Sequence, residues 1–299
     1  MMRNRFIILS VTALIAFNTG NTQVPLQPEP ISNHYRDLGK ISGSPDSKRL
    51  AMDTISFPWD EYSRGALSNS LMRTVYLNAE DEAKLPTLIS YPANSSEQTK
   101  AELDYLLQLQ YTRTGEQIRK AEYIAQIGSS PSIINPTDSE YNVNIQHLFY
   151  IAGNVGEWYN AENFPATARL LINTIQDIRV TEFRLKRFFK RARPYHLEPL
   201  LKPLARISSP SFASGHTLWA FTQAYIFSEI IPDKRIGFIE RAEEVRWSRE
   251  LMGIHFPSDN EASRIIAWQI LKAWFKNPLF VSDLEKAKIE WDLKKNMYR

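Results

Sequence analysis

The sequence predicts an all-α protein, and three observations support this fold class. First, apolar residues recur at helical spacing in two segments, namely Leu103, Leu106, Leu107 and Tyr111, and Leu171, Ile175 and Ile178 after Pro165. Second, four segments have the length and pattern of long helices, namely 214–231, 234–252, 258–277 and 279–297. Third, the alternating patterns typical of strands are scarce. We therefore expect helices throughout, with functional loops at their ends.

The start of the segment 258–277 carries a specific capping signal. Ser258 is followed three residues later by Glu261, which is the spacing of a capping box. In such a box the serine and the acidic residue each satisfy a free backbone N–H at the start of the helix. We therefore expect Ser258 to be the cap of this helix.

The composition is that of an ordinary globular protein, with 43% apolar and 23% charged residues among 299. A net charge of +3 is too small to indicate a nucleic-acid partner, and the basic residues lack the aromatic interleaving of a stacking groove. No cysteine is present, which excludes disulfides, thiolate metal sites and a cysteine nucleophile. We expect one domain with an N-terminal extension and no nucleic-acid partner.

The first 22 residues resemble a signal peptide. Arg3 and Arg5 precede an apolar stretch at 6–17, whose length of about twelve residues suits export better than membrane spanning. An uncleaved membrane anchor and a buried helix are the alternatives. We expect a periplasmic or secreted protein, in which residues 23–55 form an N-terminal arm and 56–299 the domain. Residues 23–47 are rich in Pro, Gly, Ser and Asn, so no firm structure is expected there.

The segment 186–194 carries the first candidate binding residues. Lys186 and Arg193 are seven residues apart, so two helical turns place them on one face, and Pro194 places Arg193 at or near a helix end. Two cations in this arrangement can hold one oxyanion. A solvated basic helix face is the alternative for the whole run, and we assign three further cations to that class: Arg187, Lys190 and Arg191.

The second motif is Ser214-Gly215-His216, at the start of a long helix. Ser214 is a candidate N-cap, and Gly215 allows a ligand to approach the backbone. Free N–H groups and the positive end of the helix dipole favour a phosphate there. His216, in the first turn, faces the same ligand and can donate a proton to a leaving group. An ordinary helix cap with an incidental histidine is the alternative.

The third motif spans residues 248–259. Arg249 shares an inward-facing helical stripe with Ala242, Val245 and Met252. A buried arginine needs an anionic partner. His255 and Asp259 are separated by Pro257, so a tight turn is expected to bring them together. An aspartate that holds one imidazole nitrogen leaves the other free to attack an electrophile. Compensation of a helix dipole by Asp259 and an ordinary loop histidine at His255 are the alternatives.

Each motif alone leaves its alternative open, whereas the ordered set Lys-x6-Arg-Pro, Ser-Gly-His and Ser-Arg-x5-His-x3-Asp is highly specific. With this set the sequence resembles the type 2 phosphatidic acid phosphatase (PAP2) and vanadium haloperoxidase superfamily. Size, export signal and the run 258–264 make it most similar to the bacterial class A non-specific acid phosphatases. The resemblance covers roughly residues 60–275 and implies a single-domain helical bundle of this superfamily's type.

The resemblance implies a role for each matched position. His255 would attack phosphorus and form a phosphohistidine, Asp259 would orient it, and His216 would protonate the leaving alcohol and later activate water. The phosphoryl oxygens would be held by Lys186, Arg193, Ser214, Gly215 and Arg249. Neither a metal nor a cofactor is required, because cations and a helix start can supply the electrostatic stabilisation. The implied activity is metal-independent hydrolysis of phosphomonoesters in the acid range.

One position departs from the family pattern. The residue before Ser-Gly-His is usually proline, and here it is Ala213, although Pro210 can supply part of the turn. We expect a looser loop with unchanged chemistry. No catalytic role is assigned to the remaining histidines: His34, His147 and His196.

Three other functions remain open. A haloperoxidase would hold vanadate in the same cradle, but such enzymes are usually larger. A lipid phosphate phosphatase would act at the membrane surface, although no second long apolar run is present. A phosphate-binding protein without turnover would not need two histidines. We expect a small phosphomonoester as substrate, phosphate or vanadate as ligand, and a homo-oligomer as one possible state.

Overall fold

The computed structural model describes residues 33–127 and 135–298, and within them it contains helices and loops but no strand. The long helices are α4 (Glu97–Thr112), α5 (Gly115–Gln126), α7 (Pro165–Phe189), α9 (Gly215–Ile230), α10 (Arg235–Leu251), α11 (Pro257–Trp274) and α12 (Pro278–Lys294). The short α-helices are α1 (Asn33–Leu38), α2 (Arg64–Asn69), α3 (Ala79–Lys84), α6 (Tyr141–Gln146) and α8 (Pro194–Leu197). Short 3₁₀ turns are η1 (Leu50–Thr54), η2 (Trp59–Glu61), η3 (Leu85–Leu88), η5 (His147–Ala152) and η6 (Pro232–Lys234). The predicted all-α class is confirmed.

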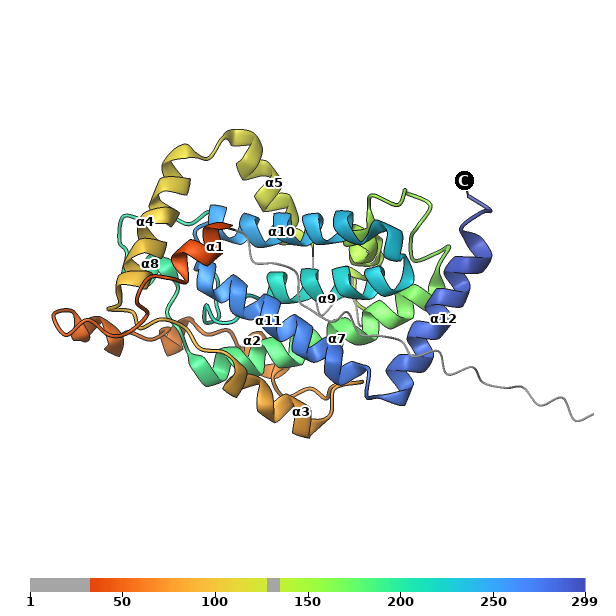
Figure 1. The fold of residues 1–299 in the computed structure, drawn as a ribbon, viewed down its shortest axis with the longest axis horizontal. Helices are drawn as coiled ribbons and strands as arrows, with labels where there is room; N and C mark the ends of the chain where they lie inside the picture. The colour runs from red at the N-terminus through yellow and green to blue at the C-terminus, as the bar shows by residue number, and fades with distance from the viewer. Residues whose placement is uncertain (1–32, 128–134, 299) are drawn as a thin grey trace, which may run out of the picture.

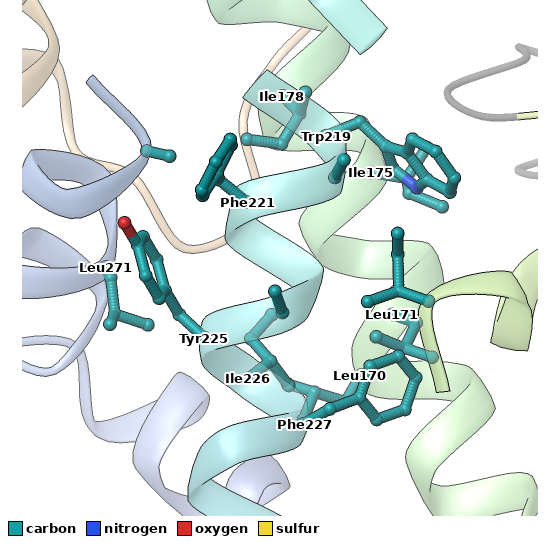
Figure 2. Close-up of a cluster of buried hydrophobic side chains, with 14 of the residues drawn as sticks. Leu170, Leu171, Ile175, Ile178, Trp219, Phe221, Tyr225, Ile226, Phe227 and Leu271 are labelled. Carbon is teal, nitrogen blue, oxygen red and sulfur yellow. The ribbon is translucent and has the colours of Figure 1, made fainter. Parts of the chain in front are cut away.

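Helix α9 forms the centre of the bundle. It is apolar on all sides, as expected of a helix that is buried all round. Helices α10, α11, α7 and α12 pack around it, and α4 and α5 form an arch at one end (Figure 1). Figure 2 shows the interface between α7 and α9, where Leu171 and Ile175 lie beside the aromatic side chains of α9. The first turn of α9 is likewise buried, with Gly215, Thr217 and Leu218 inside the bundle.

The predicted long helices lie within a few residues of their observed bounds. Leu103 and Leu106 are buried as their spacing indicates, but Tyr111 is 75% exposed and does not belong to the buried face. The capping prediction at Ser258 is wrong. Helix α11 begins at Pro257, and Phe256 is its N-cap residue. The carboxylate of Asp259, the third residue of the helix, accepts the backbone N–H of Phe256 at 2.9 Å.

The N-terminal region is only partly described. Residues 1–32, which include the expected signal peptide, lie outside the described residues. The expectation that residues 23–47 lack firm structure is wrong for the described part, because α1 is a helix with Leu38 buried. Its Tyr35 hydroxyl donates a hydrogen bond to Glu250 of α10. The boundary of the expected arm at residue 55 stays a prediction.

Among the described helices, none has both the length and the apolar character that crossing a bilayer requires.

Candidate active site

The three motifs meet at one cavity of about 430 Å³, which lies where α7 ends and α9 begins. Six of the eight predicted site residues line it: Lys186, Arg193, Gly215, His216, Arg249 and His255. Ser214 and Asp259 lie behind the wall, and both are fully buried. A larger cavity of about 1080 Å³, near Tyr123 and Arg241, contains none of the eight. The structure therefore brings the sequence motifs together in space.

Lys186 and Arg193 approach the cavity from two different elements. Helix α7 ends at Phe189 because Lys190 adopts a left-handed conformation, with φ of 51°. Arg193 therefore lies beyond the helix, as the N-cap of α8, and the prediction of a shared helical face is wrong. Both side chains are nonetheless about 99% buried. The reversal of the chain at Lys190, and not helical periodicity, brings the two cations together.

The charges of these two residues are poorly compensated. The Lys186 ammonium donates to the backbone carbonyl of Pro210 at 2.7 Å. Burial, and then the nearby Arg193 cation, lower the pKa of Lys186 to about 7. Burial also lowers the pKa of Arg193, whose guanidinium donates to the carbonyls of Ser209 and Ile254 at 2.9 and 2.8 Å. An anionic ligand in the cavity would stabilise both cations.

Arg249 lies on the inward-facing stripe of α10, as predicted, and is 1% exposed. Its guanidinium donates to the Ala121 carbonyl at 3.1 Å and to the Ser248 hydroxyl at 3.0 Å. Within the described ranges no carboxylate forms an ion pair with it, and burial lowers its pKa to about 9. The anionic partner that a buried arginine requires is thus not supplied by this part of the chain.

The start of α9 forms the opposite wall. Ser214 is the N-cap as predicted, but its hydroxyl donates to Thr217 Oγ1 at 3.0 Å and accepts no backbone N–H of the helix. His216 lies in the first turn, and its Nε2–H donates to the Ala125 carbonyl of α5 at 3.3 Å. Burial, followed by the Arg249 cation, holds the pKa of His216 well below its usual value. The imidazole is therefore neutral in the free protein.

His255 and Asp259 form the expected contact across the start of α11. His255 Nδ1 lies 3.2 Å from Asp259 Oδ2, and Arg193 Nη1 lies 2.9 Å from His255 Nε2. Arginine can only donate, so Nε2 is the acceptor and Nδ1 carries the proton that Asp259 accepts. Burial, together with the Arg193 cation, holds the pKa of His255 well below its usual value. The geometry presents a neutral imidazole at the cavity wall, whose Nε2 lone pair accepts a hydrogen bond from Arg193.

Behind this pair lies a charge network that includes Arg191, which sequence reasoning wrongly assigned to a solvated face. Arg191 is 1% exposed and forms ion pairs with Asp259 at 2.6 Å and with Glu102 of α4 at 3.6 Å. Its guanidinium also lies over the ring of Phe256, 3.9 Å from the centroid. Burial acts to raise the pKa of Asp259, but Arg191 and the hydrogen bonds from His255 and Ser211 hold it well below its usual value. The orienting aspartate therefore stays ionised.

Glu182, one turn before Lys186 on α7, is a second residue that the sequence did not reveal. Its carboxylate lines the cavity and is 7% exposed. A methyl group placed at Gly215 would overlap this carboxyl group, so the space that the glycine leaves is filled by Glu182. The spacing of Glu182 and Lys186 is that of an ordinary ion pair on a helix, which gives no signal of a site.

The loop before Ser214 is closely packed, although it lacks the proline that is usual in the family. Phe212 and Ala213 are fully buried, and Phe212 packs edge-on against Phe189 with ring centroids 4.7 Å apart. The peptide bond between Phe212 and Ala213 is cis. The aromatic contacts of Phe212 hold this loop where a proline is usual, and the expectation of looseness is wrong.

The other histidines lie outside the cavity wall. His196 accepts the backbone N–H of Arg193 at Nδ1, 3.2 Å away, and contacts Glu61 at 3.3 Å through Nε2. It therefore supports the Arg193 loop from outside. Within the described residues, no group of three or more His, Asp or Glu side chains could hold a metal ion.

Comparisons with known proteins match the region of the chain that contains this site. Residues 166–280 match the sequence model of the PAP2 superfamily, and this segment contains all eight predicted site residues. A non-specific acid phosphatase of Providencia stuartii is 33% identical over 133 residues, which are 42% of this chain and 54% of the relative. A non-specific acid phosphatase of Salmonella typhimurium is 28% identical over 169 residues, which are 54% of this chain and 66% of the relative. The chain thus spans about half to two thirds of the length of these relatives.

Two solved structures also align with the chain. A bacterial vanadium-dependent iodoperoxidase has a TM-score of 0.43 and 16% identity, and the alignment covers 61% of this chain and 50% of that one. A transmembrane PAP2-type phosphatidylglycerolphosphate phosphatase from Bacillus subtilis has a TM-score of 0.41 and 17% identity, with 71% and 94% covered. The sequence match confirms the predicted resemblance: residues 166–280 are similar to the PAP2 superfamily.

Proposed function

We propose that the protein hydrolyses phosphate monoesters through a phosphohistidine at His255, without a metal ion. One observation carries the proposal: an imidazole oriented by Asp259 lies at the wall of a cavity whose buried cations have no strong anionic partner, and a single hydrogen bond from Arg193 covers its Nε2. Such a cavity favours an anionic phosphoryl group. The relatives that are named acid phosphatases support this assignment.

Substrate binding would exchange existing contacts for contacts with phosphoryl oxygens. Lys186, Arg193 and Arg249 now donate largely to backbone carbonyls, and a phosphate offers them stronger, charge-assisted hydrogen bonds. When Arg193 turns its N–H toward a phosphoryl oxygen, the lone pair on His255 Nε2 becomes free. The backbone N–H of Gly215, at the start of α9, would complete the cradle.

In the first chemical step, His255 Nε2 forms a bond to phosphorus while the bond from phosphorus to the ester oxygen breaks. The electron pair leaves with that oxygen, which takes the Nε2 proton of a protonated His216. Asp259 remains ionised and stabilises the positive charge that develops on His255. Because burial lowers the pKa of His216, an acid medium favours the imidazolium that this step requires.

In the second step, His216 is neutral and takes a proton from water as the water oxygen attacks phosphorus. The bond between phosphorus and Nε2 breaks, His255 regains its lone pair, and phosphate leaves. All charge stabilisation in this scheme comes from the protein's own cations and the start of α9. We also propose a periplasmic or extracellular location, because Arg3 and Arg5 precede an apolar stretch at 6–17, as in a signal peptide.

Hydrolysis of p-nitrophenyl phosphate by the protein and by His255→Ala tests the proposal. We expect the variant to lose at least about 1,000-fold in kcat, because it lacks the nucleophile. Glu80→Gln, a change at an exposed residue of α3, is the matched control and should keep the full rate. Equal rates for the protein and His255→Ala would refute the assignment. Activity that EDTA abolishes and a divalent ion restores would refute metal independence.

A further inference from the structure

Glu182 is an acidic side chain inside a cavity that is otherwise built for an anion. It lines the same cavity as Lys186, Arg193 and His255, and it is 93% buried, since 7% of it is exposed. A carboxylate is the group least expected beside a phosphoryl site, because like charges repel at close range. Its presence therefore requires an explanation in terms of what the ligand offers.

The contacts of Glu182 leave hydrogen-bonding capacity free. Oε1 lies 3.8 Å from the Lys186 ammonium, and Oε2 lies 3.8 Å from the Arg179 guanidinium, so both distances exceed that of a hydrogen bond. Oε2 is buried and accepts no hydrogen bond from any part of the chain that the structure describes. Lys186 directs its short hydrogen bond to the Pro210 carbonyl instead. The carboxylate is thus a buried acceptor that lacks a donor.

The position of the carboxylate puts this acceptor where the ligand would lie. The Glu182 carboxyl group lies directly over Gly215, so that even a methyl group added there would collide with it. Gly215 is the first residue of α9, where the free N–H groups attract an anion. A phosphoryl group bound at this helix start would touch the carboxylate.

We propose that Glu182 selects oxyanions that carry a proton, by accepting a hydrogen bond from a P–OH group of the ligand. An ionised carboxylate can only accept hydrogen bonds, so a protonated phosphoryl oxygen satisfies it and a bare oxygen does not. Sulfate has the same shape but no proton, so its oxygen lone pairs would face the lone pairs of the Glu182 carboxylate and repel them. For the ester substrate, this inference rests on the proposed function. Glu182 would be the group that distinguishes phosphoryl from sulfuryl ligands.

Equilibrium binding of inorganic phosphate and of sulfate tests the proposal without any need for turnover. At about pH 8 both ions are mainly dianions, but only phosphate still carries a proton, so the comparison is matched for charge. We expect the unchanged protein to prefer phosphate by about tenfold to a hundredfold, the range of one hydrogen bond to a charged group. Isothermal titration calorimetry measures both affinities.

Glu182→Gln is the informative variant, because its amide can donate to any oxyanion and its shape is unchanged. We expect the ratio of phosphate affinity to sulfate affinity to fall to near one, mainly through tighter binding of sulfate. Glu182→Leu, which removes the acceptor and adds no donor, should also lose the preference. Glu80→Gln, on the exposed face of α3, should leave the ratio unchanged.

Each outcome decides the matter. A collapsed ratio in both Glu182 variants supports the proposal. An unchanged ratio overturns it, whether both affinities rise, as for an acceptor that merely obstructs the site, or both fall, as for a residue that only positions Lys186. Failure of the unchanged protein to bind phosphate also overturns it. If p-nitrophenyl phosphate is not hydrolysed but the preference is present, the proposed phosphatase function fails and the selectivity of Glu182 stands.

Discussion

The buried arginines around the active site belong to two groups that differ in what neutralises them. Arg191 is paired with two carboxylates, at 2.6 Å from Asp259 and 3.6 Å from Glu102. Arg193 and Arg249 are as deeply buried, yet within the described residues neither forms an ion pair, and both donate mainly to backbone carbonyls. The charge of Arg191 is neutralised by carboxylates of the protein, whereas the charges of Arg193 and Arg249 would be neutralised only by an anion in the cavity.

This difference indicates which cations serve the fold and which serve the ligand. A buried charge without a partner costs stability, so a protein that keeps such charges gives up stability for a function. A buried ion pair, in contrast, becomes a liability only when one partner is removed. The two groups should therefore respond in opposite ways to the same substitution.

Arg191→Met should produce the largest loss of stability. The change leaves Asp259 and Glu102 buried without their cation, and breaking a buried ion pair in this way costs about 3–5 kcal/mol. Denaturation in urea, followed by circular dichroism, measures the free energy of unfolding. A loss below about 1 kcal/mol would show that the network does not hold the fold together.

Arg249→Met should show the reverse pattern. We expect kcat/KM to fall by about 100-fold to 1,000-fold, because one positive donor to the phosphoryl group is lost. The free energy of unfolding should stay the same or rise, since burial already lowers the pKa of Arg249 to about 9. Kinetics with p-nitrophenyl phosphate and urea denaturation supply the two numbers. If stability dropped as far as in Arg191→Met, the division into two groups would be wrong.

Glu102→Gln tests the Arg191 ion-pair network through the pH dependence of the free energy of unfolding. Burial raises the pKa of the Glu102 carboxyl to about 7, although Arg191 and Ser258 oppose this, so the folded state binds the proton more tightly than the unfolded chain. The stabilisation by Glu102 is therefore full below about pH 4.5 and is lost as pH rises through about 7. The glutamine variant lacks this titration.

We expect the difference in unfolding free energy between about pH 4 and pH 8 to change by about 3 kcal/mol in Glu102→Gln relative to the unchanged protein. The variant should gain stability at the higher pH, because no charge needs to be buried. Urea denaturation at both pH values measures it. Parallel pH profiles for the two proteins would contradict the raised pKa of Glu102.

The sequence alone predicts the fold class and those site residues that belong to short motifs. The apolar run of α9 and the periodicity of α7 fixed those helices, and the Ser-Gly-His and His-x3-Asp spacings are local, so chain geometry alone brings their members together. The prediction for Arg191 is wrong because it treats the basic run 186–193 as one solvated helix face, whereas the left-handed Lys190 ends the helix before Arg191. Glu102 bonds to Ser258 across 156 residues, a contact that no local pattern encodes.

Lys186 gives the smallest but most specific prediction, because it is the cavity cation that titrates near neutral pH. Burial and the Arg193 cation lower its pKa to about 7, so at about pH 8 most of the free protein has a neutral Lys186. A bound phosphate dianion favours the charged form and raises that pKa. Binding should therefore take up a fraction of a proton per site at about pH 8, and less at about pH 6, where Lys186 is already charged.

Calorimetric titration with phosphate in buffers of different ionisation enthalpy measures this proton uptake. Lys186→Arg is the matched variant, since it keeps a cation at this position but does not titrate in this range. Uptake should fall in the variant by the share that Lys186 contributes. Equal uptake in both proteins would assign the proton to His216 or to the phosphate itself, and it would mean that the Lys186 cation is already paired before the ligand arrives.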